Sequence, residues 1–369
     1  MIVIHYSEIG TKGRNRDYFE DQLIENVKRI VNGKVYKRYG MIVVDTKEKK
    51  DLSLIPGVAY YSYAENAKLD LEDIKEKSLA LLRKENFESF KIVSSRSNKN
   101  FNLTSPELNE KIGEFIFEKL NKKVKLKNPE KTLFVEVGEK EAFVYTEKIR
   151  GIGGLPVGIS GDVVCSLSGG LDSPVAGFLM MNRGCKVIFV HVYNKTLHGK
   201  GMQEKLKKIV KELSIIQGES KLYMVPFGDI QNEIIEKVDA KYRMIVYRRF
   251  MMRIIGKIAI KEKCKFIVTG DSVGQVASQT LENLNCIWDA SNINVFAPLI
   301  GMNKDSIVDI AKKINTYEHS IMPYPDCCSY MIAKHPVTKS RLDYIEREEK
   351  DIDVKLVEKS VSEAELEII

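Results

Sequence analysis

A short stretch of glycines and serines near the middle of the chain has the residue types of a phosphate-binding loop. It reads SLSGGLDSPVAG over residues 166–177. Glycines let backbone N–H groups approach a phosphate, and the hydroxyls of Ser168 and Ser173 add donors beside the positive end of a helix that we expect to begin near Asp172. The spacing is neither GxxxxGK[ST] nor GxGxxG. We therefore predict a phosphate site of another kind, in which Asp172 either caps the helix or holds Mg²⁺ on the phosphates. The alternative is a plain glycine turn without a ligand.

Two adjacent cysteines, Cys327 and Cys328, lie in the segment PYPDCCSYMIAKHP, residues 323–336. Neighbouring Cα atoms are about 3.8 Å apart across a trans peptide, below the usual disulfide range, so a bridge between the two would be strained. Adjacent side chains face different ways, which disfavours a shared structural zinc. Taken alone, each cysteine is best explained as a buried structural residue. If the segment lies beside a reactive site, either cysteine could instead act as a reactive thiol.

A long apolar helix is expected over residues 241–260, KYRMIVYRRFMMRIIGKIAI. It is apolar nearly all round and should be buried, yet Arg248, Arg249 and Arg253 lie inside it. Buried guanidinium groups need anionic partners, which an internal carboxylate or the phosphates of a nucleotide can supply. We expect at least one of the three arginines to contact a nucleotide.

These segments need a scaffold, and the pattern of residues 162–280 supplies one. Strands without polar alternation (VVCSL, KVIFVHVY, KLYMVPF and KFIVTG) alternate with helices. That pattern indicates an α/β fold with a doubly wound parallel sheet, whose ligands bind beyond the carboxyl ends of the strands. The loop at Ser168 leaves the first of these strands, and Gly270, Gln275, Ser278 and Gln279 follow the last. We expect both to face one cleft.

The first 150 residues have the pattern of two small α+β units. Residues 1–50 read as a strand, a basic loop, a helix and two strands, and residues 60–150 end with the alternating strands LFVEV and AFVYTE. Thr104 and Glu107 have the spacing of a helix capping box, with Pro106 in the first turn. We expect domains at residues 1–55, 56–150 and 162–340, a glycine-rich linker at 151–161 and an acidic tail at 341–369.

Composition and charge narrow the class of protein. The net charge is +7, of which residues 341–369 carry −5 and residues 1–340 carry +12. The most basic stretch, residues 119–131, holds six lysines and one glutamate, which fits a nucleic-acid surface or a merely solvated one. The six cysteines are sparse and form no CxxC pair, which disfavours a disulfide scaffold or a zinc ribbon. With no signal-peptide pattern and no 18-residue apolar run, we expect a cytoplasmic protein without a membrane span.

Together the motifs resemble a known family. SGGLDS resembles the PP-loop of the ATP pyrophosphatases, which split ATP into AMP and pyrophosphate. Nearly the whole chain resembles the tRNA 4-thiouridine synthetase (ThiI) family. EIGTKGRNRDYFEDQL is similar to its N-terminal ferredoxin-like domain, and FKIVSSRSNKNFNLTSPELN and VYTEKIRGIGGLPVG to its tRNA-binding THUMP domain. LSGGLDSPVAG, YRRFMMR, TGDSVGQVASQT and PYPDCC with KHPVTK are similar to its PP-loop domain.

The resemblance implies an activity and residue roles. It implies that ATP adenylates C4 of uridine 8 in tRNA, releasing pyrophosphate, and that sulfur then replaces the oxygen. Catalytic roles are implied for Asp172, near the Mg²⁺ that accompanies the ATP phosphates, and for a sulfur-carrying cysteine, with Cys328 favoured over Cys327. The implied ATP contacts are Ser166, Leu167, Ser168, Gly169, Gly170, Asp172, Ser173, His191, Val192, Arg248, Gly270 and Gln279. We expect tRNA contacts at Arg96, Lys99, Lys122, Lys123, Lys125 and Lys127.

The sulfur source is the main departure from the family's longer members, which append a rhodanese domain that carries the persulfide. Only about thirty residues follow KHPVTK. We therefore expect a separate donor: a persulfide carrier, free sulfide or an iron–sulfur cluster, the last disfavoured by the missing CxxC. The lack of a rhodanese domain also disfavours the family's rhodanese-dependent role in thiazole synthesis. The sequence does not decide whether the protein forms a homodimer. The alternative functions are another PP-loop ligase, and a tRNA-binding module with a vestigial nucleotide site.

Overall fold

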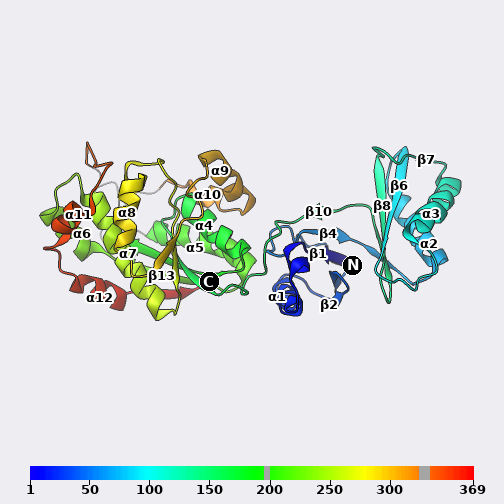
Figure 1. The fold of residues 1–369 in the computed structure, drawn as a ribbon, viewed down its shortest axis with the longest axis horizontal. Helices are drawn as coiled ribbons and strands as arrows, with labels where there is room; N and C mark the ends of the chain where they lie inside the picture. The colour runs from blue at the N-terminus through cyan, green and yellow to red at the C-terminus, as the bar shows by residue number, and fades with distance from the viewer. Residues whose placement is uncertain (195–199, 324–332) are drawn as a thin grey trace. The chain divides into compact units, whose positions relative to one another are not determined.

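The chain is described by a computed structural model that covers residues 1–194, 200–323 and 333–369. It forms two compact units, residues 1–156 and 157–369, whose elements are labelled in Figure 1. Cys327 and Cys328 lie outside the described residues. In the described part of the chain, every helix is too short or too polar to cross a membrane.

The first sheet of unit 1–156 is antiparallel and follows the predicted strands. Its strands are β1 (Ile2–His5), β2 (Lys34–Arg38), β3 (Met41–Asp45), β4 (Tyr60–Tyr63) and β10 (Ile149–Arg150), in the order β10-β4-β1-β3-β2. The short helix η1 (Glu8–Thr11) and helix α1 (Arg16–Lys28) lie between β1 and β2, and α1 buries Phe19, Leu23 and Val27 as their spacing predicted. The first domain was expected to end at residue 55, but two strands of this sheet come from later in the sequence. The chain leaves the sheet after β4 and returns to it at β10.

The second sheet of this unit is mixed and is covered by two helices. Its strands are β5 (Glu65–Ala67), β6 (Ser89–Arg96), β7 (Lys123–Val124), β8 (Lys131–Val137) and β9 (Ala142–Tyr145), in the order β5-β9-β8-β6-β7. Helices α2 (Leu71–Leu82) and α3 (Ser105–Leu120) share a buried apolar cluster with it. The predicted capping box is confirmed: the Thr104 hydroxyl accepts from the Glu107 N–H, and the Glu107 carboxylate accepts from the Thr104 N–H at 2.7 Å.

Unit 157–369 contains the predicted doubly wound sheet. Its strands are β11 (Asp162–Ser166), β12 (Lys186–Tyr193), β13 (Lys221–Pro226), β14 (Phe266–Val268), β15 (Asn294–Phe296) and β16 (Glu365–Ile368), in the order β15-β14-β11-β12-β13-β16. The first five pair in parallel, and β16 adds antiparallel to β13. From β11 the chain builds outward to β13 and then returns to β14 on the other side of β11. The switch point where such sheets bind ligands therefore lies between β11 and β14.

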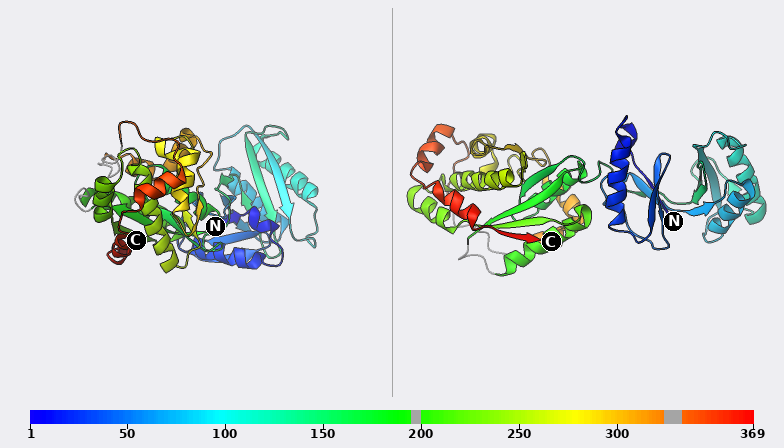
Figure 2. Two further views of the ribbon diagram at one scale, coloured as in Figure 1. Left: turned by 60° about the vertical axis from the view of Figure 1, so that its left-hand side comes forward. Right: turned by 90° about the horizontal axis from the view of Figure 1, so that it is seen from below.

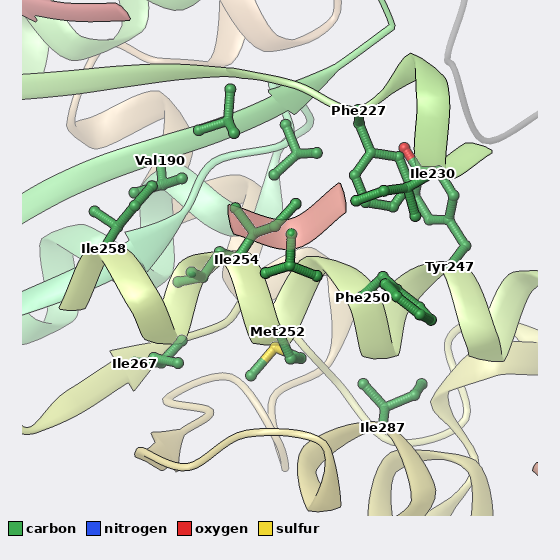
Figure 3. Packing of buried hydrophobic residues seen from close by; sticks show 14 of the residues in the cluster. Val190, Phe227, Ile230, Tyr247, Phe250, Met252, Ile254, Ile258, Ile267 and Ile287 are labelled. Atoms are coloured by element: carbon green, nitrogen blue, oxygen red, sulfur yellow. The ribbon is translucent and has the colours of Figure 1, made fainter. Parts of the chain in front are cut away.

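Helices and one large apolar core fix this sheet. The helices are α4 (Asp172–Asn182), α5 (Lys200–Gln217), α6 (Gly228–Lys237), α7 (Arg243–Lys261), η2 (Ala277–Gln279), α8 (Leu281–Asp289), α9 (Lys304–Lys313), α10 (Tyr317–Ser320), α11 (Leu342–Glu349) and α12 (Lys355–Ser362). Figure 3 shows α7 packed between Val190 of the sheet on one side and Ile287 of α8 on the other. The predicted burial of this apolar helix is confirmed, with Phe250, Ile254 and Ile258 fully buried.

Residues 341–369 are folded into this unit and do not form the acidic tail that composition suggested. Ile345 and Val357 join the large core, and β16 covers the edge of β13 with a register that pairs Tyr223 with Leu366. Figure 2 shows this last strand, in red, running beside the green strands of the sheet. The acidic residues lie mostly on the outer side, so composition alone did not reveal the buried apolar positions between them.

Candidate active site

A cavity of about 470 Å³ opens at the carboxyl ends of β11 and β14, at the switch point of the sheet. Its lining contains predicted site residues from three separate segments: Ser166, Ser168, Asp172, Ser173, Arg248, Gly270 and Gln279. Apolar side chains of α7 also line it: Met244, Ile245, Met251, Met252 and Ile255. A cavity lined by both hydrogen-bonding and apolar groups suits a ligand that carries both phosphates and an aromatic base.

The glycine–serine loop after β11 is held in shape by its own hydroxyls. The Ser168 N–H donates to Ser173 Oγ at 3.0 Å, and the Gly170 N–H donates to Ser168 Oγ at 3.3 Å. Gly169 has a φ of 82°, a conformation that costs glycine little and other residues more. The loop ends at the first turn of α4, whose residues Asp172 and Ser173 line the cavity, so the positive end of this helix lies beside it.

Gly270, which follows β14, comes into close contact with the start of α4. A Cβ added at Gly270 would lie 2.8 Å from Ser173 N and 3.0 Å from the carbonyl carbon of Asp172. Both neighbours are backbone atoms and cannot rotate away. The glycine therefore allows the strand end and the start of α4 to pack directly against each other, a contact that sequence reasoning did not predict.

Asp172 is held from two sides at the mouth of the loop. Gln275 Nε2 donates to one carboxylate oxygen and Lys304 Nζ donates to the other, each at 2.7 Å. Lys304 is the first residue of α9 and lies 132 residues from Asp172 in the sequence. Sequence reasoning missed Lys304, because no local pattern links these two positions. Gln275 was expected to face the cleft. It contacts Asp172 but does not itself line the cavity.

Arg248 is anchored by the buried carboxylate of Asp271, which sequence reasoning also missed. Arg248 Nη2 lies 2.6 Å from Asp271 Oδ1, and Gln279 Nε2 donates to the same oxygen at 3.1 Å. Burial alone would raise the pKa of Asp271, but the Arg248 charge and the hydrogen bonds to the carboxylate outweigh it and hold this pKa below its ordinary value. Asp271 thus stays ionised and fixes two predicted ATP residues, Arg248 and Gln279, on one wall of the cavity.

Arg249 and Arg253, the other two arginines of α7 for which a nucleotide contact was considered, have internal partners. Arg249 makes two hydrogen bonds to Glu349, at 3.0 and 2.9 Å, and Arg253 binds the same carboxylate at 3.0 Å. Neither residue lines the cavity. The sequence allowed each arginine either an internal carboxylate or a nucleotide phosphate as its partner. Arg249 and Arg253 bind the internal carboxylate, and of the three arginines only Arg248 lines the cavity.

Four other predicted ATP contacts lie beside the cavity and do not line it: Leu167, Gly169, Gly170 and Val192. Val192 belongs to the apolar core. His191 also does not line it; its ring is buried, with Nδ1 donating to the carbonyl of Leu167 at 2.7 Å. Any contact that these residues make with ATP stays a prediction.

The predicted tRNA-binding residues lie on the second sheet of unit 1–156. Lys123, Lys125 and Lys127 are exposed on and after β7. Lys122 is paired with Glu88 at 2.8 Å, and Arg96 Nη1 donates to the carbonyl of Phe101 at 3.2 Å, close to Lys99. The exposed lysines are free to approach a phosphate backbone, and Arg96 also shapes the loop after β6.

The four cysteines that the structure describes, Cys165, Cys185, Cys264 and Cys286, are all buried. Burial raises the pKa of the Cys165 thiol to about 12 and contributes most to raising that of Cys264 to about 11. A nucleophilic or sulfur-carrying cysteine needs a lowered pKa and access to its substrate. Cysteines in the described part of the chain thus lack the properties of a sulfur carrier, and the predictions for Cys327 and Cys328 concern residues outside it.

Comparison with known proteins places these features in a family. Residues 158–354 match the family described as thiamine biosynthesis protein (ThiI), residues 68–147 match the THUMP domain, and residues 1–62 match the ThiI ferredoxin-like domain. The chain is 39% identical over 384 residues to a probable tRNA sulfurtransferase of Acetivibrio thermocellus, covering 99% of this chain and 98% of that protein. It is 40% identical over 361 residues to one of Thermoanaerobacter pseudethanolicus, covering 95% of each.

Two solved structures resemble the whole chain or most of it. A crystal structure of a 4-thiouridine synthetase–RNA complex with bound ATP has a TM-score of 0.93 and 35% identity, covering 100% of this chain and 99% of that one. The structure of PH1313 from Pyrococcus horikoshii has a TM-score of 0.67 and 27% identity, covering 85% of this chain and 99% of that one. The 4-thiouridine synthetase thus has the same fold over the whole chain, with the three matched parts in the same order.

Proposed function

The chain belongs to the ThiI family of tRNA sulfurtransferases, and from this premise we propose that it uses ATP to convert uridine 8 of tRNA to 4-thiouridine. The observation that carries the proposal is the cavity at the switch point of the sheet. There residues of the phosphate loop, Gly270 and the Asp271-anchored Arg248 line one cavity together with apolar side chains of α7. The related 4-thiouridine synthetase, with RNA and ATP bound, supports both ligands.

ATP occupies the cavity with its phosphates beside the polar residues of the lining. The hydroxyls of Ser168 and Ser173 and the positive end of α4 hold the phosphates, and Arg248 adds a fixed positive charge. Mg²⁺ usually binds one or two carboxylates together with substrate phosphates. Asp172 lines the cavity and would be the carboxylate that holds Mg²⁺, in place of its contact with Lys304. No group of three or more acidic, His or Cys side chains in the described residues offers a separate metal site. The ion would neutralise the pyrophosphate that leaves.

The chemistry has two steps. O4 of the uridine attacks the α-phosphorus of ATP and pyrophosphate leaves, which turns a poor leaving group into AMP. A sulfide-level sulfur then forms a bond to C4, the C4–O bond breaks, and AMP departs with the former O4. With sulfide, the step needs no oxidant or reductant, only loss of a proton.

Cys328, or else Cys327, carries the sulfur to C4. The buried state and raised thiol pKa values of Cys165 and Cys264 support a carrier elsewhere in the chain. A separate persulfide carrier reloads it: the cysteine thiolate attacks the outer sulfur of the donor, and the donor leaves as a thiol. The outer sulfur of the cysteine persulfide then bonds to C4 as AMP leaves, and a further thiol cleaves the S–S bond to release 4-thiouridine. Free sulfide, in contrast, bonds to C4 directly and does not load the cysteine. A rate of thiolation that is unaffected by Cys328→Ser would remove that residue from the mechanism.

One assay separates this proposal from its alternatives. The protein is incubated with unmodified tRNA, ATP, Mg²⁺ and sulfide, and 4-thiouridine is read from its near-ultraviolet absorbance. We expect thiolated tRNA from the wild type and none from Asp172→Ala. A small-substrate ligase would not bind tRNA, and a vestigial nucleotide site would bind tRNA without consuming ATP. Full thiolation by Asp172→Ala would refute the assignment of this cavity.

A further inference from the structure

The cavity is lined along one face of α7, and part of that face has no role in the proposed binding of ATP. Lining residues recur every three to four positions from Lys241, just before the helix, to Ile255, with Arg248 near the middle. Lys241 precedes Arg248 by seven positions, which is about 10 Å along the helix axis. The lined face is therefore long enough to contact more than one ligand group.

The two ends of this lined face differ in their access to solvent. Helix α7 ends shortly before β14 begins, so its last turn lies near the amino end of that strand and its first turn lies toward the carboxyl ends, where ligands enter. Lys241 is exposed, whereas Ile255 is fully buried. The base of a free nucleotide can fill the buried end, but a nucleotide within tRNA is attached on both sides and must enter at the exposed end.

The geometry of phosphoryl transfer limits where the target uridine can lie. The attacking and leaving oxygens stand roughly in line through the phosphorus. If the phosphate loop and the start of α4 hold the pyrophosphate, O4 of uridine must reach the α-phosphorus from the side away from them. Five lining residues lie outside the loop, outside the predicted ATP contacts and outside the buried end of α7, and we call them the mouth subsite: Lys241, Val276, Ser278, Pro336 and Val337.

A single buried amide joins the segments that form the mouth subsite. Asn283, fully buried in the first turn of α8, donates through Nδ2 to the carbonyl of Ala277 at 2.8 Å and to that of Val337 at 2.9 Å. Its Oδ1 accepts from the Ser340 N–H at 3.1 Å, and the Val337 N–H donates to the carbonyl of Lys241 at 3.2 Å. The mouth subsite is therefore one connected surface, although its residues come from three segments.

The uncharged side chains of the mouth subsite suit a pyrimidine base. Val276 is apolar and yet 53% exposed, and with the half-buried Pro336 and Val337 it offers an apolar surface against which a base can pack. Ser278 adds a hydroxyl, which can donate to or accept from the polar edge of the base.

Lys241 supplies a positive charge that can be released to a phosphate. Of the described residues that line the cavity, only Lys241 and Arg248 are cationic, and Arg248 is held by Asp271. Lys241 Nζ lies 3.3 Å from Asp239 Oδ2, and the two side chains are 47% and 51% exposed. So open an ion pair is weak, and Lys241 can exchange this carboxylate for a phosphate of the tRNA backbone.

We propose that the mouth subsite binds the target uridine of tRNA, with its base against Val276 and Val337 and an adjoining backbone phosphate on Lys241. The proposal rests on the proposed function, because it assigns the second substrate of the same cavity. It places O4 at the exposed end of the cavity, next to the α-phosphate of an ATP whose base fills the buried end.

The first test separates the use of tRNA from the binding of ATP in the Lys241→Gln variant. Thiolation with ATP, Mg²⁺ and sulfide is measured over a range of tRNA and salt concentrations, and ATP binding is measured by calorimetry without tRNA. Lys359→Gln is the matched control, because Lys359 is exposed in the same unit and also pairs with an exposed carboxylate, that of Asp229 at 2.7 Å.

We expect Lys241→Gln to lower kcat/KM for tRNA about tenfold and to reduce its salt slope by about one, as the loss of one phosphate contact should. The Kd for ATP should stay within about twofold of the wild type, because the exposed lysine is about 10 Å from Arg248 and its charge is screened. Lys359→Gln should change neither quantity. An unchanged kcat/KM for tRNA in Lys241→Gln would overturn the proposal. So would a Kd for ATP that rises in parallel, because Lys241 would then hold ATP.

A second measurement locates the base without any substitution. 4-Thiouridine forms crosslinks to adjacent groups under near-ultraviolet light, so tRNA that already carries it at position 8 is irradiated in complex with the wild-type protein, and the crosslinked residue is identified by mass spectrometry. We expect the crosslink within residues 276–278 or 336–337. A crosslink found entirely outside these residues would overturn the proposal. Failure of the proposed function looks different, since the wild type would then form no 4-thiouridine, whereas this crosslink requires no turnover.

Discussion

Replacing Gly270 by alanine tests whether the contact between β14 and the phosphate loop positions the nucleotide. The new Cβ would lie 2.8 Å from Ser173 N, whereas ordinary contacts begin near 3.4 Å. The strand end and the first turn of α4 must therefore separate by about 0.6 Å, and overpacking of this kind costs about 1–3 kcal/mol of folding free energy. The displaced groups are those that we expect to hold the phosphates. A shift approaching 1 Å can cost up to about 100-fold in function, and we predict about a tenfold rise in the Kd for ATP, equivalent to about 1.4 kcal/mol.

Equilibrium binding of ATP, measured by calorimetry together with thermal unfolding, checks this prediction. Gly301→Ala is the matched control, because a Cβ at Gly301 meets no atom within 4 Å and its φ is not positive. The control should bind ATP like the wild type. An ATP Kd for Gly270→Ala within twofold of the wild type, in a folded protein, would refute the reasoning, since the loop would then tolerate the displacement.

Three further predictions concern charge. Changing the exposed lysines of the basic strand to glutamate should weaken tRNA binding and reduce the slope of log Kd against log salt by about two to three; these residues are Lys123, Lys125 and Lys127. Asp271→Asn should lower the free energy of unfolding at pH 7 by about 3 kcal/mol, because its guanidinium partner loses a buried counter-charge. The pKa of Asp271 lies below the ordinary 3.8. The stability that its carboxylate contributes is therefore complete above about pH 4 and is lost as the pH falls through the lowered pKa of the folded state. The Asp271→Asn variant should lack this acid-dependent loss of stability. Glu349→Gln should cost a similar amount of stability but leave the Kd for ATP within twofold, because the two arginines that it binds do not line the cavity.

Binding at several salt concentrations and denaturant unfolding at several pH values are the measurements. Unchanged tRNA affinity in the triple lysine variant would show that this strand is only a solvated surface. An acid-unfolding profile of Asp271→Asn that parallels the wild type would show that the carboxylate is not held ionised in the folded state. A large loss of ATP affinity in Glu349→Gln would place its arginine partners in the nucleotide site after all.

Local features of the fold and site could be predicted from the sequence. The loop at Ser168 follows from glycines and hydroxyls next to one another, the cap of α3 from Thr104 and Glu107, and the parallel sheet from apolar strands between helices. In each case the physical cause lies within a few residues. The switch point then follows from topology alone, and it brings the loop and Gly270 to one cavity.

Contacts between distant segments could not be predicted in this way. The partner of Arg249 is Glu349, 100 residues away, whereas the sequence could only predict that at least one of three arginines contacts a nucleotide and not which one. Lys304 reaches Asp172 only because α9 packs on α4. Residues 341–369 looked like an acidic tail because the buried positions of α11, α12 and β16 are few and widely spaced. Such pairings depend on how whole elements pack and not on local spacing.

The direct test of the central claim, adenylation of O4 of uridine, follows the fate of that oxygen. The tRNA carries an ¹⁸O label at C4 of its target uridine and is thiolated with ATP and sulfide, and the AMP is analysed by mass spectrometry. The account predicts that one labelled oxygen appears in AMP for each 4-thiouridine formed. AMP without the label, with the ¹⁸O released to water or found in pyrophosphate, would contradict it.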